Sequence, residues 1–186
     1  ICESLKSMSA LFVGSSRPVR DIEAFTKFEN KILVFANRGL AGIDGNISTA
    51  FGIAEEYEVT NSIMGDLTFL HDISALTNAT KKNLRIFVID NNGGGIFSTL
   101  PQAGSNGFEQ VFGTPHNLDL VKVISGFGVS VSRVSDLSGL ELVARKPVNG
   151  FEVVIVQVPS REDNARMLKE ITQRVSSAVR IGINLA

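Results

Sequence analysis

The stretch Leu84-Arg-Ile-Phe-Val-Ile-Asp90-Asn-Asn-Gly93 joins a run of apolar residues to a polar turn rich in asparagine and glycine. A nearly continuous apolar run of this length is typical of a strand that is buried on both faces, as in a parallel sheet. A second run, Val153-Val-Ile-Val156, has the same character. These two stretches therefore predict a parallel β-sheet that is covered by helices on both sides.

The rest of the chain alternates between short strand-like runs and helix-like segments. Such alternation predicts an α/β fold that is doubly wound, with a mainly parallel six-stranded sheet and right-handed crossovers. The expected strands span residues 10–13, 32–36, 62–64, 84–90, 129–131 and 152–158. The expected helices span residues 18–25, 46–57, 68–79, 118–127, 136–144 and 162–179.

The composition is that of one globular domain over residues 1–186. Apolar residues make up 44% and charged residues 20% of the chain, which excludes a disordered protein. The net charge of −1 argues against a nucleic-acid or anionic-membrane surface, because both require a basic excess. A single cysteine and two histidines exclude a disulfide framework and argue against a Cys- or His-rich metal site.

The first residues contain neither an initiator methionine nor a secretory signal, and no apolar run is long enough to span a bilayer. We therefore expect a piece of a longer, cytoplasmic protein. Ligands of doubly wound sheets bind beyond the carboxyl ends of the strands. The loops expected to lie at the ligand site are thus residues 37–45, 65–67 and 90–95. Residues 93–113 are expected to form an active-site loop.

Gly65-Asp66 and Asn91 each follow a predicted strand, and the interval between them accommodates one helix and one strand. A carboxylate and a carboxamide at one sheet edge suit Mg²⁺, which prefers oxygen ligands. The helix that begins after Asp66 would also favour a phosphate group at its N-terminus. The alternative is that Asp66 only caps a helix and that Asn91 and Asn92 only form a turn.

Two further loops carry arginine after a predicted strand, and the strand before Arg38 is expected to be buried. Glycines in the loop 37–45 let its backbone approach a ligand closely, and Arg38 could hold a carboxylate with two hydrogen bonds. Ser16 and Arg20 could contact an anionic ligand, or Ser16 could only cap a helix. In the alternative interpretation, the arginines are surface residues or pair with nearby acids such as Asp21 or Asp44.

Taken together, these segments resemble the MenD family, the 2-succinyl-5-enolpyruvyl-6-hydroxy-3-cyclohexene-1-carboxylate synthases of menaquinone biosynthesis. The resemblance extends from Leu11 to the last helix, and it is to the C-terminal, diphosphate-binding domain of these thiamine diphosphate (ThDP) enzymes. The matching strings are Asn37-Arg-Gly-Leu-Ala-Gly-Ile-Asp-Gly45, Gly65-Asp-Leu-Thr-Phe-Leu-His-Asp72, Asn92-Gly-Gly-Gly-Ile-Phe97 and Phe112-Gly-Thr-Pro-His116.

The resemblance implies that ThDP and Mg²⁺, or Mn²⁺, bind here. Asp66, the side chain of Asn91 and the backbone carbonyl of Gly93 would hold the metal. Asp90 stands where the family has its first asparagine, so Asn92 stays open as an alternative ligand to Asn91. The other implied cofactor-binding positions are Gly42, Ile43, Gly65 and Leu67, with Ile43 as the apolar residue that holds the cofactor in its bent form.

The resemblance also implies the substrates, 2-oxoglutarate and isochorismate. In this reaction 2-oxoglutarate is decarboxylated and its succinyl unit is added to isochorismate. Both substrates carry several negative charges, which gives the arginines a physical reason to be present. The implied substrate-binding residues are Ser16, Arg20, Arg38, Ile96 and Phe97.

No catalytic residue is expected in this chain. In the family that it resembles, the activating glutamate comes from the pyrimidine-binding domain of a neighbouring subunit, in a homodimer or homotetramer. The piece alone is therefore expected to be inactive. Two other functions stay open: the equivalent domain of another ThDP enzyme, such as an acetohydroxyacid synthase or a 2-oxoacid decarboxylase, and a non-catalytic Rossmann-like module that binds a nucleotide or mediates assembly.

Overall fold

The computed structural model describes residues 1–184 and divides into two compact units. The first, which we call the sheet unit, consists of Ile1–Asp90 and Asn117–Val158. The second unit consists of Asn91–His116 and the residues from Pro159 onward.

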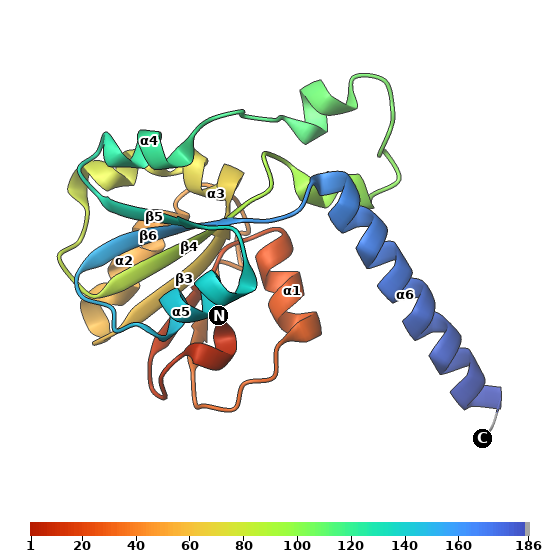
Figure 1. Cartoon of the computed structure of the whole chain (residues 1–186), viewed down its shortest axis with the longest axis horizontal. Coiled ribbons are helices and arrows are strands. Elements are labelled where there is room, and N and C mark those ends of the chain that lie inside the picture. The colour runs from red at the N-terminus through yellow and green to blue at the C-terminus, as the bar shows by residue number, and fades with distance from the viewer. Residues whose placement is uncertain (185–186) are drawn as a thin grey trace. The chain divides into compact units, whose positions relative to one another are not determined.

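The sheet unit contains a six-stranded sheet in the order β2-β1-β3-β4-β6-β5, and all five strand pairings are parallel (Figure 1). This topology confirms the predicted fold class. The chain order reverses at β1, which has β2 on one side and β3 on the other, so β1 and β3 border a topological switch point. The strands are β1 Ala10–Val13, β2 Leu33–Phe35, β3 Thr60–Gly65, β4 Leu84–Asp90, β5 Ser130–Val134 and β6 Phe151–Gln157.

Helices cover both faces of this sheet and enclose two apolar cores. Residues of α2, α3, α4 and the 3₁₀ helix η2 pack with Phe12 and Ile86 on one face. Residues of α1 and α5 pack with Leu11 and Phe87 on the other face. The helices are η1 Cys2–Ser4, α1 Arg17–Phe25, α2 Asn46–Glu56, α3 Asp66–His71, η2 Ile73–Asn78, α4 Leu120–Ser125 and α5 Leu137–Arg145.

Burial along the strands follows the apolar runs in the sequence. The first five residues of β4 and the middle four of β6 are buried, as their apolar runs predicted. The strand before Arg38 was also expected to be buried, and that was wrong. β2 is an edge strand that pairs only with β1, and its Val34 is 47% exposed.

The helix expected at residues 68–79 is instead two segments, α3 and η2, with a break at Asp72. Asp72 has φ −118° and ψ 18°, outside the α-helical region. Its carboxylate accepts hydrogen bonds from the backbone N–H of Ser48 at 2.8 Å and from the Ser48 hydroxyl at 3.3 Å. Side-chain hydrogen bonds to backbone groups compete with helix continuation. The break thus falls at the residue whose carboxylate contacts α2.

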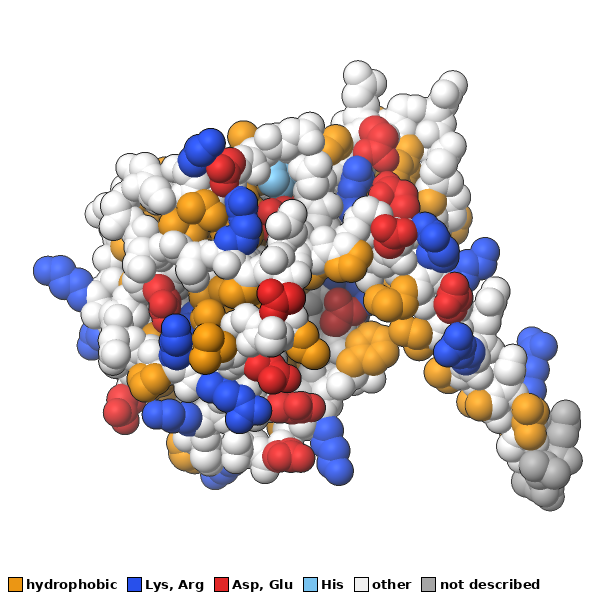
Figure 2. All heavy atoms as spheres, viewed as in Figure 1, with side chains coloured by type: hydrophobic (Ala, Val, Ile, Leu, Met, Phe, Trp, Pro, Cys, Tyr) orange, Lys and Arg blue, Asp and Glu red, His pale blue; other side chains and the backbone are white. Residues whose placement is uncertain are grey.

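The second unit contains three helical segments: η3 Gly95–Thr99, the π-helical turn η4 Glu109–Gly113, and α6 Arg161–Asn184. The loop expected at residues 93–113 thus includes two short helical segments. Apolar side chains are exposed along α6 (Figure 2), among them Met167, Val175 and Ile181. None of the helices in the described part of the chain is long and apolar enough to cross a bilayer.

Candidate functional site

The carboxyl ends of β1, β3 and β4 bring several of the predicted site residues to one edge of the sheet unit. Val13 of β1 pairs with Ile63 of β3. Ser16 and Asp66 therefore each lie three residues beyond a paired position. Because parallel strands end at the same edge, the loop after β1 and the start of α3 flank the topological switch point.

Asp66 is a buried carboxylate at the first position of α3. Its side chain is 2% exposed, and Oδ1 accepts a hydrogen bond from the backbone N–H of Leu67 at 2.6 Å. Gly65, the N-cap residue, pairs with Ile89 of β4, so Asp66 follows β3 at the level where Asp90 ends β4. A negative charge here interacts favourably with the partial positive charge of the helix N-terminus. The N-cap residue is Gly65, so the alternative in which Asp66 only caps the helix is wrong, and its role as a metal ligand stays a prediction.

Asn46, the first residue of α2, holds the loop that precedes this helix. Its Nδ2 donates to the carbonyl of Gly42 at 3.2 Å and to that of Asp44 at 2.9 Å. These two bonds flank Ile43, which is half-buried, and fix its backbone. Asn46 is fully buried, and its Oδ1 has no hydrogen-bond donor among the described residues. Sequence reasoning missed Asn46, because an asparagine at a helix start is usually an exposed cap.

Arg17 and Arg20 lie in the first turn of α1, and Arg38 follows β2. Arg17, rather than Arg20 or Arg38, pairs with Asp21 across one turn of α1. Burial raises the pKa of the Asp21 carboxyl above its usual value, and the Arg17 guanidinium only partly offsets this rise. Nη1 of Arg20 donates to the carbonyl of Ser16 at 2.6 Å. Arg38 is exposed and has no carboxylate partner among the described residues.

Ser16 has φ 77° and ψ −127°, a region that favours glycine, and its side chain makes no capping hydrogen bond. The alternative in which its hydroxyl only caps α1 is therefore wrong. Such strain costs roughly 1–3 kcal/mol and is common at ligand sites.

We expect Ser16→Gly to raise the free energy of unfolding by about 1 kcal/mol, as measured by urea denaturation. Ser16→Ala retains the strain and should not stabilise; an equal gain in both variants would contradict this explanation.

In the second unit, the segment from Asn91 to Gly95 forms a tight turn against η4. Asn92 has φ 60° and Gly93 has φ 133°, and the N–H of Gly94 donates to the carbonyl of Gly113 at 2.8 Å. A Cβ at Gly93 or Gly94 would collide with backbone carbonyls of residues 112 and 113. The turn therefore requires glycine, and its shape is set by contact with η4.

An ion pair that the sequence did not reveal supports this turn. Arg161, at the start of α6, is 8% exposed, and its Nη2 donates to Oε2 of Glu109 at 2.6 Å. Ile96 and Phe97 are half-buried in η3, and the Phe97 ring lies 5.4 Å from that of Phe112. Because the two ion-pair partners are far apart in sequence, no local pattern could have paired them.

The predicted site residues are thus divided between the units. The sheet unit carries two groups at its carboxyl edge, one after β1 and β3 and one in the loop before α2; these residues are Ser16, Arg20, Arg38, Gly42, Ile43, Gly65, Asp66 and Leu67. The second unit carries Asn91, Gly93, Ile96 and Phe97. Their assignments to metal, cofactor and substrate stay predictions.

A parallel, doubly wound sheet with a buried carboxylate and glycine-bearing loops at its carboxyl edge defines the class of α/β cofactor-binding domains. Residues 20–158 match the family model described as thiamine pyrophosphate enzyme, C-terminal TPP binding domain. The chain belongs to this family. Its cofactor is accordingly ThDP (thiamine pyrophosphate), as the sequence motifs predicted.

Two curated relatives show which members of this family the chain is similar to. The chain is 37% identical to the 2-succinyl-5-enolpyruvyl-6-hydroxy-3-cyclohexene-1-carboxylate synthase of Thermobifida fusca over 95% of its own length and 33% of that protein. It is 39% identical to the synthase of the same name from Bacillus cytotoxicus, over 92% of this chain and 30% of that protein. These matches confirm the resemblance to the MenD family. The chain spans about a third of the length of these relatives.

Solved structures show the same fold at lower identity. Benzoylformate decarboxylase from Polynucleobacter necessarius superimposes with a TM-score of 0.68 at 18% identity, covering 86% of this chain and 32% of that chain. A putative thiamin diphosphate-dependent enzyme from Mycobacterium smegmatis gives a TM-score of 0.64 at 21% identity, covering 85% of this chain and 31% of that chain. The predicted ThDP-binding fold is therefore confirmed.

Proposed function

We propose that this chain is the cofactor-binding domain of a ThDP- and Mg²⁺-dependent synthase that decarboxylates 2-oxoglutarate and adds the succinyl unit to isochorismate. The product would be 2-succinyl-5-enolpyruvyl-6-hydroxy-3-cyclohexene-1-carboxylate. The observation that carries this proposal is the similarity to curated synthases over 95% of the chain, which includes the loops beyond the sheet edge. The decarboxylase alternative has support at the level of fold alone, at 18% identity.

The residues of the sheet unit fit a metal–diphosphate group. Asp66 offers a buried carboxylate, which a divalent cation would compensate. Asn46 Oδ1 is a buried acceptor without a donor among the described residues. A Cβ built on Gly65 would meet no described atom within 4 Å, so the packing of the chain does not itself explain a glycine there.

When bound, ThDP supplies the carbanion stabilisation that the reaction needs. In the proposal, Asp66 binds the metal that holds the diphosphate, and the resemblance assigns Asn91 and Gly93 as further ligands. Asn46 keeps the backbone around Ile43 rigid, so that Ile43 presents a fixed apolar surface to the cofactor. Arg38, which no described carboxylate neutralises, binds a substrate carboxylate. The cytoplasm, the homo-oligomer and the glutamate from a neighbouring subunit are parts of the same proposal.

Gly65→Ala tests whether a ligand approaches the backbone at this position. Gly65 has φ −76° and ψ 162°, which alanine adopts without strain, so stability should stay equal or rise by up to about 1 kcal/mol. The added methyl group would crowd a bound diphosphate and weaken ThDP affinity by roughly 5- to 100-fold, measured by calorimetry. Unchanged affinity in a stable variant would remove Gly65 from the cofactor site.

Arg38→Ala tests substrate recognition. Loss of a charged hydrogen bond costs roughly 1.5–3 kcal/mol, so kcat/KM for 2-oxoglutarate or isochorismate should fall about 10- to 150-fold while ThDP affinity and Tm stay near wild type. Arg17→Ala is the matched control, because Arg17 pairs with Asp21 and should affect Tm rather than kinetics. A fall in Tm with unchanged kinetics for Arg38→Ala would make this arginine structural.

The function itself is tested on the complete protein that contains this chain. ThDP, Mg²⁺, 2-oxoglutarate and isochorismate are supplied together, and the product is identified by mass spectrometry. We expect the succinylated cyclohexene carboxylate and no turnover when pyruvate replaces 2-oxoglutarate. Turnover of pyruvate alone would favour an acetohydroxyacid synthase or a 2-oxoacid decarboxylase, and NAD binding without ThDP binding would favour a nucleotide-binding module.

A further inference from the structure

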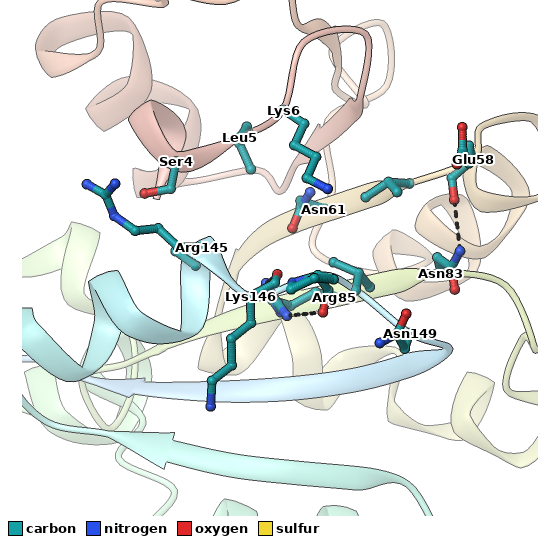
Figure 3. Close-up of a pocket in the computed structure, with 14 residues that line it drawn as sticks. Ser4, Leu5, Lys6, Glu58, Asn61, Asn83, Arg85, Arg145, Lys146 and Asn149 are labelled. Carbon is teal, nitrogen blue, oxygen red and sulfur yellow. Dashed lines mark hydrogen bonds between the residues drawn. The ribbon is translucent and has the colours of Figure 1, made fainter.

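A cavity of about 220 Å³ lies at the amino ends of the strands in the sheet unit, at the edge opposite the candidate cofactor site (Figure 3). Three segments line it: the one before β1, the starts of β3 and β4 with the residues preceding them, and the connection from α5 to β6. The cavity is smaller than the roughly 300–1,000 Å³ typical of pockets for drug-sized ligands. It therefore suits a small ion or molecule.

The lining is predominantly basic. It includes four basic residues, Lys6, Arg85, Arg145 and Lys146, and one acidic residue, Glu58. Arg85 is neutralised by Glu152 at 2.6 Å. Lys6, Arg145 and Lys146 are exposed and have no carboxylate partner in the part of the chain that the structure describes. Low-dielectric walls with one sign of charge concentrate ions of the opposite sign. The cavity thus favours an anion.

Asn61 gives the cavity a buried polar group. It lies on β3, paired in register with Arg85 of β4, and is 4% exposed. It is one of the residues that line the cavity, and no described residue donates to or accepts from its side-chain amide, so that amide is available to a ligand in the cavity. Figure 3 shows the Asn61 amide and the Lys6 ammonium pointing toward one another, whereas Lys146 points away from them. An anion between Lys6 and Asn61 would satisfy both groups.

Arg85 makes the wall of this cavity rigid. Its Nε donates to Glu152 at 2.8 Å, and its other nitrogens donate to the carbonyls of Lys146 at 3.1 Å and Pro147 at 3.3 Å. These bonds join β4 to the α5–β6 connection and fix this wall of the cavity. The guanidinium also lies 5.9 Å from the centre of the Phe87 ring.

We propose that this cavity is a binding site for a small oxyanion, a phosphate or a carboxylate, held by the ammonium group of Lys6 and the amide of Asn61. Ser4 and Arg145, whose side chains lie at the far end of the cavity in Figure 3, extend the site for a larger anion. The site is separate from the candidate cofactor site, because the two occupy opposite edges of the sheet. It does not rest on the proposed function.

Calorimetric titration of the complete protein with inorganic phosphate, and separately with acetate, tests the site. At least one of the two anions should bind saturably. Lys6→Ala removes one charged hydrogen bond and should weaken that binding about tenfold or more. Asn61→Asp is nearly isosteric but places a negative charge in the cavity, so it should abolish the binding. The anion that responds to the variants shows whether the natural ligand carries a phosphate or a carboxylate.

Lys169→Ala is the matched control. Lys169 is an exposed lysine on α6 in the second unit, so its removal changes the net charge equally and leaves the cavity intact. This variant should bind the anion like wild type. Phosphate that binds at the candidate cofactor site would be unaffected by Lys6→Ala. Binding that both lysine variants and Asn61→Asp leave unchanged, or no saturable binding of either anion, would overturn the proposal.

Discussion

Asp66→Asn is expected to weaken Mg²⁺-dependent ThDP binding by about 100-fold or more and to abolish cofactor retention at ordinary Mg²⁺ concentrations. The substitution preserves the size of the side chain and an oxygen that can accept the hydrogen bond from the N–H of Leu67. It removes the negative charge that the proposal assigns to the metal. Calorimetric titration of ThDP at fixed Mg²⁺ measures the effect.

The large expected effect follows from where Asp66 lies. A carboxylate that is 2% exposed has little access to water, so its charge needs compensation from the protein or from a bound cation. Loss of a group that only supports a metal ligand already costs about 10- to 100-fold in affinity, and loss of the ligand itself costs more. Raising the Mg²⁺ concentration should recover part of the ThDP affinity in the variant.

Asp119→Asn is the control for Asp66→Asn. Asp119 is a carboxylate of the same unit that pairs with Arg133 and Lys122 and is not one of the predicted site residues. Its substitution changes the net charge equally and should leave ThDP affinity unchanged. If both variants bind ThDP like wild type, Asp66 is not a metal ligand and its role is confined to the start of α3.

Arg85→Ala is expected to lower the free energy of unfolding by about 3–5 kcal/mol, a large part of the roughly 5–15 kcal/mol of a typical domain. Arg85 is 2% exposed and bonds to Glu152 and to two backbone carbonyls. Truncation leaves these three acceptors without their donor and opens a void beside Phe87. Urea denaturation measures the loss.

Two further variants separate the causes of this loss. Arg133→Ala breaks an exposed ion pair with Asp119 and should change Tm little, because water replaces the lost contact. Arg85→Met with Glu152→Gln removes both charges while keeping volume, and should be more stable than Arg85→Ala. A loss of less than about 1 kcal/mol in Arg85→Ala would show that the buried pair contributes no more than a surface pair.

Several features of the fold could be predicted because they depend on residues close together in the chain. β1 and β4 have the predicted bounds, and the apolar runs of β4 and β6 are buried as expected. A strand that is buried on both faces requires apolar side chains in succession, so the pattern itself carries the information. The strand–helix alternation was enough for the doubly wound class, because few topologies accommodate it.

Other features depended on contacts between segments that are distant in sequence. The break at Asp72 falls at the residue whose carboxylate contacts Ser48 on another helix. The half-exposed state of β2 depends on its position at the sheet edge, which the strand order decides. Arg17, and not Arg20 or Arg38, became the partner of Asp21, because α1 begins at Arg17 and places the two residues one turn apart.

The sequence by itself determined the fold class, the family and the loops that carry the candidate cofactor site. It could do so because glycines, acids and amides next to apolar strands are local features, and parallel topology brings the ends of such strands to one edge. Only the tertiary structure decided how those groups are held. The fully buried Asn46 that supports Ile43, the Arg161–Glu109 pair beside the glycine turn, and the cavity between Lys6 and Asn61 each join distant segments. Burial and ion pairing between such segments are set by packing, which no local pattern encodes.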